Sequence, residues 1–82
     1  MGRNDHTDEP PTARQVEIHA YMLEYQAEHG APPSLREIVD FIGASSTNAA
    51  ADHLRALKRR GMVRHYPKRT RGWVPIARET KP

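Results

Sequence analysis

The 82-residue sequence contains no cysteine and few aromatic residues. The missing cysteine excludes disulfide frameworks and thiolate metal sites. No apolar run approaches the roughly 18 residues of a membrane span, and the polar first dozen residues do not resemble a signal peptide. One tryptophan, three tyrosines and one phenylalanine are too dispersed to form a platform on which bases stack. We therefore expect one small intracellular domain with a small core and no membrane contact.

Patterns typical of enzymes are also missing. The five histidines are scattered, and none forms a metal-ligand pair with a carboxylate at helical spacing. Asp52 and His53 are adjacent, but neighbouring residues on a helix point about 100° apart. No glycine-rich phosphate loop follows an expected strand. We expect no catalytic activity, no metal, no cofactor and no small-molecule substrate.

Charge is distributed unevenly along the chain. Residues 1–52 carry three basic and nine acidic side chains, a net of −6. Residues 53–82 carry ten basic and one acidic side chain, a net of +9. This asymmetry favours a polyanionic partner for the C-terminal part, although a solvated basic surface that aids solubility is the simpler alternative.

Two capping boxes predict the first two helices inside a domain that spans residues 12–77. Residues 1–11 lack periodicity and are expected to form a disordered arm, and residues 78–82 a frayed tail. In each helix a hydroxyl residue is followed three positions later by Gln or Glu, and a glycine ends the apolar stripe. These signals lie at Thr12, Gln15 and Gly30 for the first helix and at Ser34, Glu37 and Gly43 for the second.

A third helix is expected from Thr47 to Arg60, with Ser46 as its N-cap and Gly61 just beyond its end. Very few residues separate it from the second helix, which is the spacing of a helix-turn-helix. Leu54 and Leu57 lie on the side expected to face the core.

After Gly61 the apolar period changes from 3.6 to about 2, which predicts strands at 62–66 and 72–77. Val63 and Trp73 are the expected inward-facing residues. Pro75 requires an edge position, because proline cannot donate to a ladder. The fold class is therefore mainly α (α+β): a three-helix winged helix-turn-helix with a C-terminal two-stranded β-hairpin as the wing.

The outward face of the third helix suits a DNA major groove. Its first residues are short and polar, so the backbone can approach base edges closely. Asn48 can bind adenine through two hydrogen bonds, Asp52 can accept one from cytosine N4, and an alanine methyl can touch the thymine methyl. Arg55 and Arg59 are better placed for phosphates. We expect contacts to the DNA backbone from Arg14, Ser34, Thr47, Arg55, Arg59 and Arg60, and from the wing residues Lys68, Arg69 and Arg71.

A family resemblance is carried by the segments "PTARQVEI", "HGAPPSLREI", "GASSTNAAADHLRALKRRGMV" and "TRGW". Together they resemble the N-terminal DNA-binding domain of the LexA repressor family, over about Thr12 to Ile76 and without a gap. The resemblance implies a winged helix-turn-helix that represses genes of the SOS response to DNA damage. Carried over position by position, it implies base contacts from Ser46, Asn48, Ala49, Ala51 and Asp52.

Two features depart from the family pattern. The best-known LexA repressors carry glutamates at the positions of Ala51 and Asp52, so we expect a different operator sequence. Such repressors also continue into a self-cleaving, dimerising peptidase domain with a serine–lysine dyad. These 82 residues contain no such part, so we expect either a stand-alone unit that does not cleave itself, such as a small bacterial or phage regulator or a competitor for operators, or an excised piece of a longer protein.

The partner expected from these patterns is double-stranded DNA, bound in the cytoplasm at the nucleoid, with a homodimer possible on the DNA. The alternative is a winged helix that docks on a transcription component or on another repressor. A protein-binding version should carry exposed apolar anchors where this helix has Ser46, Thr47 and Asn48. The sequence therefore favours DNA.

Overall fold

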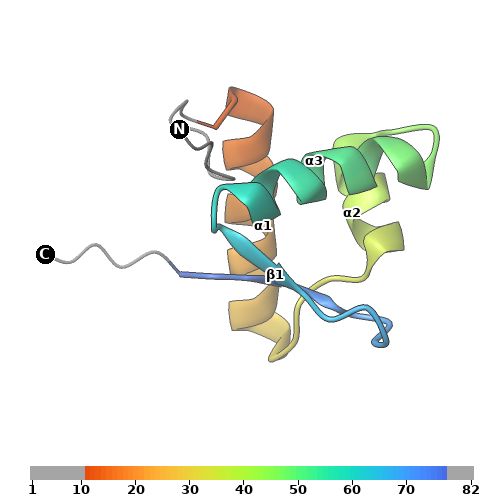
Figure 1. Ribbon diagram of the computed structural model, residues 1–82. Helices are drawn as coiled ribbons and strands as arrows, with labels where there is room; N and C mark the ends of the chain where they lie inside the picture. Colours follow the sequence, from red (N-terminus) through yellow and green to blue (C-terminus); the bar gives the residue numbers. More distant parts are fainter. Residues whose placement is uncertain (1–10, 78–82) are drawn as a thin grey trace, which may run out of the picture.

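The computed structural model describes residues 11–77, so the expected tail and all of the expected arm except Pro11 lie outside the described residues. The described chain contains three helices and a β-hairpin in the predicted order (Figure 1). The elements are α1 (Ala13–His29), α2 (Leu35–Ile42), α3 (Thr47–Arg59), β1 (Val63–His65) and β2 (Trp73–Pro75).

Both predicted capping boxes are confirmed. At the start of α1 the Gln15 N–H donates to Thr12 Oγ1 at 3.2 Å, and the Thr12 N–H donates to Gln15 Oε1 at 3.1 Å. At the start of α2 the Glu37 N–H donates to Ser34 Oγ at 3.2 Å, and the Ser34 N–H donates to Glu37 Oε1 at 2.8 Å. Gly30 and Gly43 end the two helices, each with a φ of 77°.

Helix α3 ends at Arg59, one residue earlier than predicted. Arg60 is the C-cap, and Gly61 follows it with a φ of 75°. The Gly61 N–H donates to the Lys58 carbonyl at 3.0 Å, and the Met62 N–H donates to the Leu57 carbonyl at 2.9 Å. This pair of bonds is a Schellman motif, which closes the helix where a left-handed glycine permits it.

The hairpin is shorter than the predicted strands 62–66 and 72–77. β1 and β2 pair antiparallel, with Val63 opposite Pro75 and His65 opposite Trp73. Hydrogen bonds continue just outside the strands, from the Tyr66 N–H to the Gly72 carbonyl and from the Ile76 N–H to the Met62 carbonyl. Pro75 stands opposite Val63 in a pair that exchanges no ladder hydrogen bonds, so its missing N–H removes none between the two strands. Gly72 closes the intervening loop so tightly that a Cβ there would lie 2.2 Å from the Tyr66 carbonyl oxygen.

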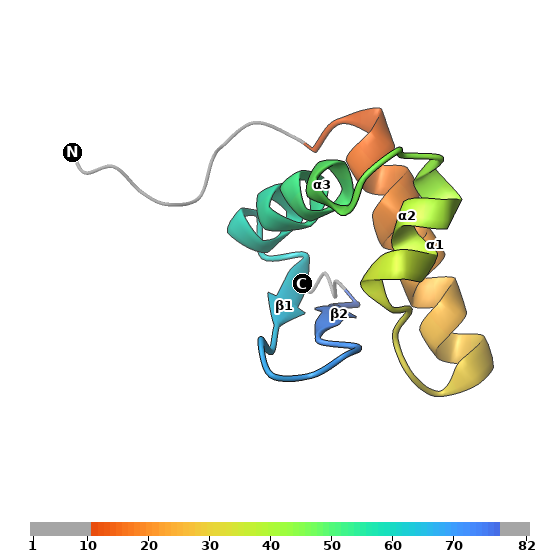
Figure 2. The ribbon, with the colours of Figure 1, turned by 90° about the vertical axis from the view of Figure 1, so that its right-hand side faces the viewer.

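The core lies where the three helices and the hairpin meet. Its fully buried large side chains include Ile18, Met22, Ile38, Leu54 and Leu57. Val63 joins them as predicted, whereas Trp73 is partly buried, packs on the core and stacks on His65 with ring centroids 3.8 Å apart. In Figures 1 and 2 the hairpin lies beneath α3, and the loop between its strands extends toward the N-terminal end of α2.

Candidate nucleic-acid interface

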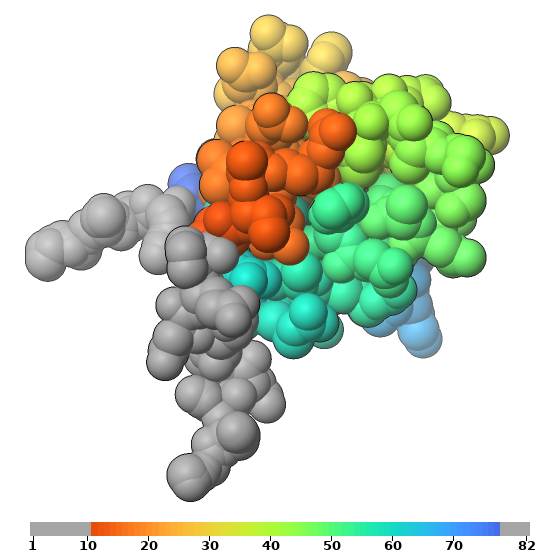
Figure 3. All heavy atoms as spheres, turned by 90° about the horizontal axis from the view of Figure 1, so that it is seen from above, coloured from red at the N-terminus to blue at the C-terminus, as the bar shows by residue number. Residues whose placement is uncertain are grey.

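The burial pattern of α3 confirms the predicted division of this helix into two faces. Ala50, Leu54 and Leu57 are buried against the other elements. The residues that point to solvent are Ser46, Thr47, Asn48, Ala49, Asp52, Arg55, Lys58 and Arg59. Ala51 is half-buried, so its methyl group is less accessible than the other four predicted base-contacting residues. Figure 3 shows α3 on an open face of the molecule, beside the start of α1 and the turn that follows α2.

The start of α3 differs from the starts of the other two helices. Thr12 and Ser34 use their hydroxyl oxygens to cap α1 and α2. Within the described residues the Ser46 side chain makes no capping hydrogen bond, although Ser46 is the N-cap of α3. The first N–H groups of a helix attract anions because they lack partners within the helix. The hydroxyl and the first turn of α3 are therefore available to an external ligand.

Asp52 and Arg55 form an ion pair on the exposed face of α3. Arg55 Nη2 lies 2.6 Å from Asp52 Oδ1. The pair connects one predicted base-contacting residue with one predicted phosphate-contacting residue. The i, i+3 spacing on a helix is a sequence signal for such a pair.

Three other predicted backbone-contacting residues, Arg14, Ser34 and Arg60, already contact a neighbour within the protein. Arg14 is exposed near the start of α1 and lies 3.4 Å from Glu17. Ser34 is half-buried in its capping box. Arg60 is half-buried and donates from Nη1 to the Ala56 carbonyl at 3.5 Å. Arg14 keeps its positive charge on the surface, whereas Ser34 and Arg60 are only partly exposed.

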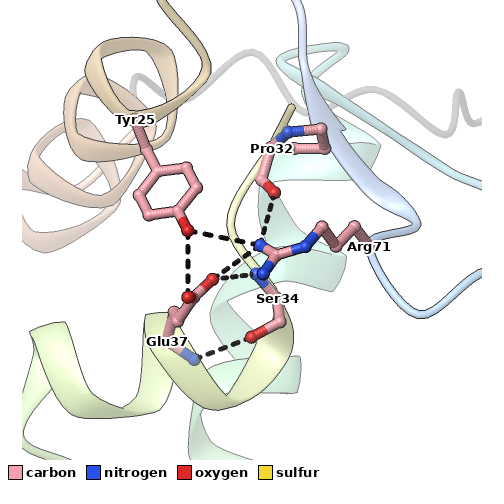
Figure 4. Close-up of polar contacts among 5 residues, drawn as sticks. All are labelled: Tyr25, Pro32, Ser34, Glu37 and Arg71. Atoms are coloured by element: carbon pink, nitrogen blue, oxygen red, sulfur yellow. Dashed lines mark hydrogen bonds and ion pairs between the residues drawn. The ribbon is translucent and has the colours of Figure 1, made fainter. Parts of the chain in front are cut away.

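The wing loop, residues 66–72, contains the three predicted cationic residues in two different settings. Lys68 and Arg69 are exposed, and the Arg69 guanidinium lies 5.3 Å from the centre of the Tyr66 ring. Arg71 instead turns back toward the helices. Its Nη1 lies 2.7 Å from Glu37 Oε1 and 3.0 Å from the Pro32 carbonyl oxygen (Figure 4).

Tyr25 completes this polar cluster. Its hydroxyl donates to Glu37 Oε2 at 2.9 Å and accepts from Arg71 Nη1 at 3.4 Å. Hydrogen bonds to its carboxylate lower the pKa of Glu37 from 4.5 to about 2. The bond from Arg71 has the largest effect, and those from the Ser34 N–H and the Tyr25 hydroxyl have smaller ones. The same carboxylate raises the pKa of Arg71. We call Tyr25, Glu37, Arg71 and the Pro32 carbonyl the wing anchor, which no pattern in the sequence predicted.

Residues 11–77 contain neither a metal-ligand cluster nor a helix that could span a membrane. No group of three or more His, Cys, Asp or Glu side chains in this range could hold a metal ion. No helix in the same range is long and apolar enough to cross a membrane. Within the described chain, the polar start of α3 and the basic wing loop are the features best suited to a polyanion.

Three helices, a helix-turn-helix and a basic wing define a winged helix-turn-helix DNA-binding domain. Comparison with known proteins agrees, because the model of the family described as LexA DNA binding domain matches residues 8–72. The chain therefore belongs to the LexA DNA-binding domain family.

Three LexA repressors illustrate the similarity. The chain is 38% identical over 66 residues to that of Anaeromyxobacter dehalogenans, a match that covers 80% of this chain and 29% of the relative. It is 41% identical over 61 residues to that of Pseudomonas aeruginosa, covering 74% and 30%. It is 46% identical over 52 residues to that of a Roseiflexus species, covering 63% and 24%. The chain thus matches less than a third of the length of these relatives.

Proposed function

We propose that this chain is a sequence-specific regulator that binds double-stranded DNA, with α3 in the major groove and the wing loop along the phosphates. The observation that carries the proposal is the exposed start of α3, where Ser46, Thr47 and Asn48 lie open to solvent. A helix that enters the groove needs small polar groups at this end. The basic wing loop adds the positive charge that phosphates attract.

Selection of bound DNA from a random pool, with the 82-residue chain as bait, tests this function. We expect an enriched half-site of a few base pairs and competition that favours it over scrambled DNA at the same salt concentration. If the selected DNAs shared no sequence, and if selected and scrambled DNA competed equally well, sequence-specific binding would be rejected.

The proposed base contacts come from Ser46, Asn48, Ala49, Ala51 and Asp52. Asn48 is the strongest candidate, because its amide matches the donor and acceptor of adenine and its side chain is exposed. Backbone contacts are proposed for Arg14, Ser34, Thr47, Arg55, Arg59 and Arg60. Lys68 and Arg69 are proposed to add phosphate or minor-groove contacts from the wing loop.

The names of the relatives support a role in repression. The three compared proteins are LexA repressors, and we propose that this chain also lowers transcription by occupying an operator. We place this action in the cytoplasm, at the nucleoid, and propose that it needs no catalysis and no cofactor. A reporter gene behind the selected site, with and without the chain, measures repression directly.

We propose that two copies assemble on DNA rather than in solution. A single recognition helix contacts few base pairs, so a monomer should bind at about micromolar concentration or weaker. Two half-sites about one helical turn apart would allow tight binding. Analytical ultracentrifugation should therefore show mainly monomer for the free chain and pairing when the double site is added. A stable dimer of the free chain at low micromolar concentration would contradict this prediction.

Docking on another protein is the second candidate function, and one observation favours it. Tyr21 and Phe41 stack with ring centroids 4.2 Å apart in a shallow depression between α1 and α2, and Phe41 is 42% exposed. This aromatic pair lies on α1 and α2 and not on the exposed start of α3. If the chain selected no DNA sequence from the random pool but still repressed a reporter gene, docking on another protein would become the favoured function.

A further inference from the structure

We infer that the wing anchor positions the wing for DNA binding: Arg71 acts by holding the loop against α2, not by contacting a phosphate. The inference rests on the proposed DNA-binding function. Its central observation is that a cationic wing residue is bound to Glu37, Pro32 and Tyr25, which lie 34, 39 and 46 positions away in the chain.

The hairpin alone gives the wing loop little support. Each strand has only three residues. Lys68 and Arg69 lie in the loop beyond these short strands and are both exposed. Arg71 connects the far end of that loop to two other parts of the fold, the α1–α2 connection and the first turn of α2 (Figure 4).

Glu37 joins two functions in one carboxylate. Its Oε1 accepts from both the Ser34 N–H, which caps α2, and Arg71 Nη1, which anchors the wing. Helix α2 is the first helix of the helix-turn-helix, and it packs on α3. The wing loop is therefore held to the same unit that carries the recognition helix. A fixed separation lets wing contacts and groove contacts form together without a further loss of loop freedom.

One substitution at Glu37 can remove its ion pair with Arg71 while leaving the N-terminal cap of α2 in place. The capping box of α1 uses Gln15 where that of α2 uses Glu37, so a glutamine at this position can still accept the N-cap N–H. Glu37→Gln should keep α2 capped but remove the charge that holds Arg71. Glu24→Gln is the matched control, because it removes an exposed negative charge from α1 outside the wing anchor.

Electrostatics alone and the positioning role predict opposite results for Glu37→Gln. Removing a negative charge should raise DNA affinity if only the field of the protein matters. A released Arg71 that reached a phosphate would raise it further. Positioning predicts that Glu37→Gln binds the selected site about threefold to tenfold more weakly and binds scrambled DNA no more weakly than the parent. Glu24→Gln should bind both DNAs at least as tightly as the parent.

A double-mutant cycle identifies the groups through which the anchor acts. In a background with Lys68→Ala and Arg69→Ala, the wing has lost its exposed cations, so Glu37→Gln should have little further effect on the selected site. An undiminished loss in that background would show that the wing cations do not mediate the effect. That result would overturn the inference.

Wing position can also be measured without DNA, which separates this inference from the proposed function. The sequence has no cysteine, so spin labels can be placed at Thr70→Cys in the wing loop and Val16→Cys on α1, two exposed positions. Pulsed electron paramagnetic resonance should give a narrow distance distribution for the parent and a broader one for Glu37→Gln, but not for Glu24→Gln. Equal or tighter binding of the selected site by Glu37→Gln, or an unchanged distribution, would overturn the inference. Failure of the parent to select any DNA sequence would instead reject the proposed function, and the distance measurement would still test the anchor.

Discussion

Arg55 and Asp52 face solvent together on α3, with Arg55 Nη2 2.6 Å from Asp52 Oδ1. Their side chains are 56% and 73% exposed, so water and salt weaken the attraction and the pair contributes little to stability. Its larger effect is on binding. Asp52 reduces the charge that Arg55 presents to phosphates, and Arg55 occupies an oxygen that could accept from a base.

Asp52→Ala should relax sequence preference without weakening non-specific binding. The variant loses an acceptor for cytosine N4, but it also removes a negative charge and releases Arg55 toward phosphates. Competitive binding to selected and scrambled DNA measures both effects. Asp52→Glu combined with Ala51→Glu should move the preference toward the operator of LexA repressors that carry glutamates at these positions. Unchanged discrimination in both variants would remove Asp52 from the set of base contacts.

Asn48→Ala should cost about 1–3 kcal/mol on the selected site, because it removes a pair of hydrogen bonds to one base. It should cost far less on scrambled DNA, where phosphates supply most of the free energy. The fold should be unaffected, since Asn48 is exposed, and a melting curve checks this. Lys68→Ala is the contrasting control, expected to weaken both DNAs alike. An equal loss on both DNAs for Asn48→Ala would show that this residue does not distinguish bases.

Binding should depend steeply on salt. If four to six cationic groups contact phosphates, log K should fall against log salt with a slope of roughly −4 to −5, at about 0.9 per contact. Replacing Lys68 and Arg69 by Ala should reduce the magnitude of the slope by about two. Titrations of one DNA at several salt concentrations measure this. A slope that both substitutions leave unchanged would place the wing loop outside the interface.

The pH dependence of stability should reveal the Glu37–Arg71 pair. The hydrogen bond from Arg71, with smaller effects from the Ser34 N–H and the Tyr25 hydroxyl, lowers the pKa of Glu37 from 4.5 to about 2 in the folded protein. A lowered carboxyl pKa stabilises the fold above its unfolded value, and this contribution disappears as the pH falls from about 4.5 to 2. The melting temperature of the parent should therefore fall more steeply through this range than that of Glu37→Gln. Parallel curves for the two proteins would contradict the predicted link.

Local patterns in the sequence were sufficient to predict the helices and the division of α3 into two faces. Thr12 with Gln15 and Ser34 with Glu37 predicted the helix starts, because a capping box needs only residues three positions apart. Strand ends were predicted less well. The Met62–Ile76 and Tyr66–Gly72 hydrogen bonds lie just outside the regular strands, and the tight approach at Gly72 closes the loop; both depend on how the two strands meet.

The setting of Arg71 could not be predicted from the sequence. The positive charges between Tyr66 and Gly72 suggested that all three cations serve one purpose. The structure separates Arg71 from Lys68 and Arg69 because its guanidinium meets Glu37 from a distant helix. Glu37 had a sufficient local role as the capping residue of α2, so no sequence signal assigned it a second partner.

The sequence by itself determined where the helices begin and, to within one residue, where they end, which side of each is apolar, and that the positive charge gathers after Asp52. These properties follow from capping, backbone conformation and helical periodicity, which act over a few neighbouring residues. The tertiary structure alone decided which cations remain exposed and which is held by a carboxylate. Those outcomes depend on groups such as Tyr25, Glu37 and Arg71, which become neighbours only when the helices and the hairpin pack around one core.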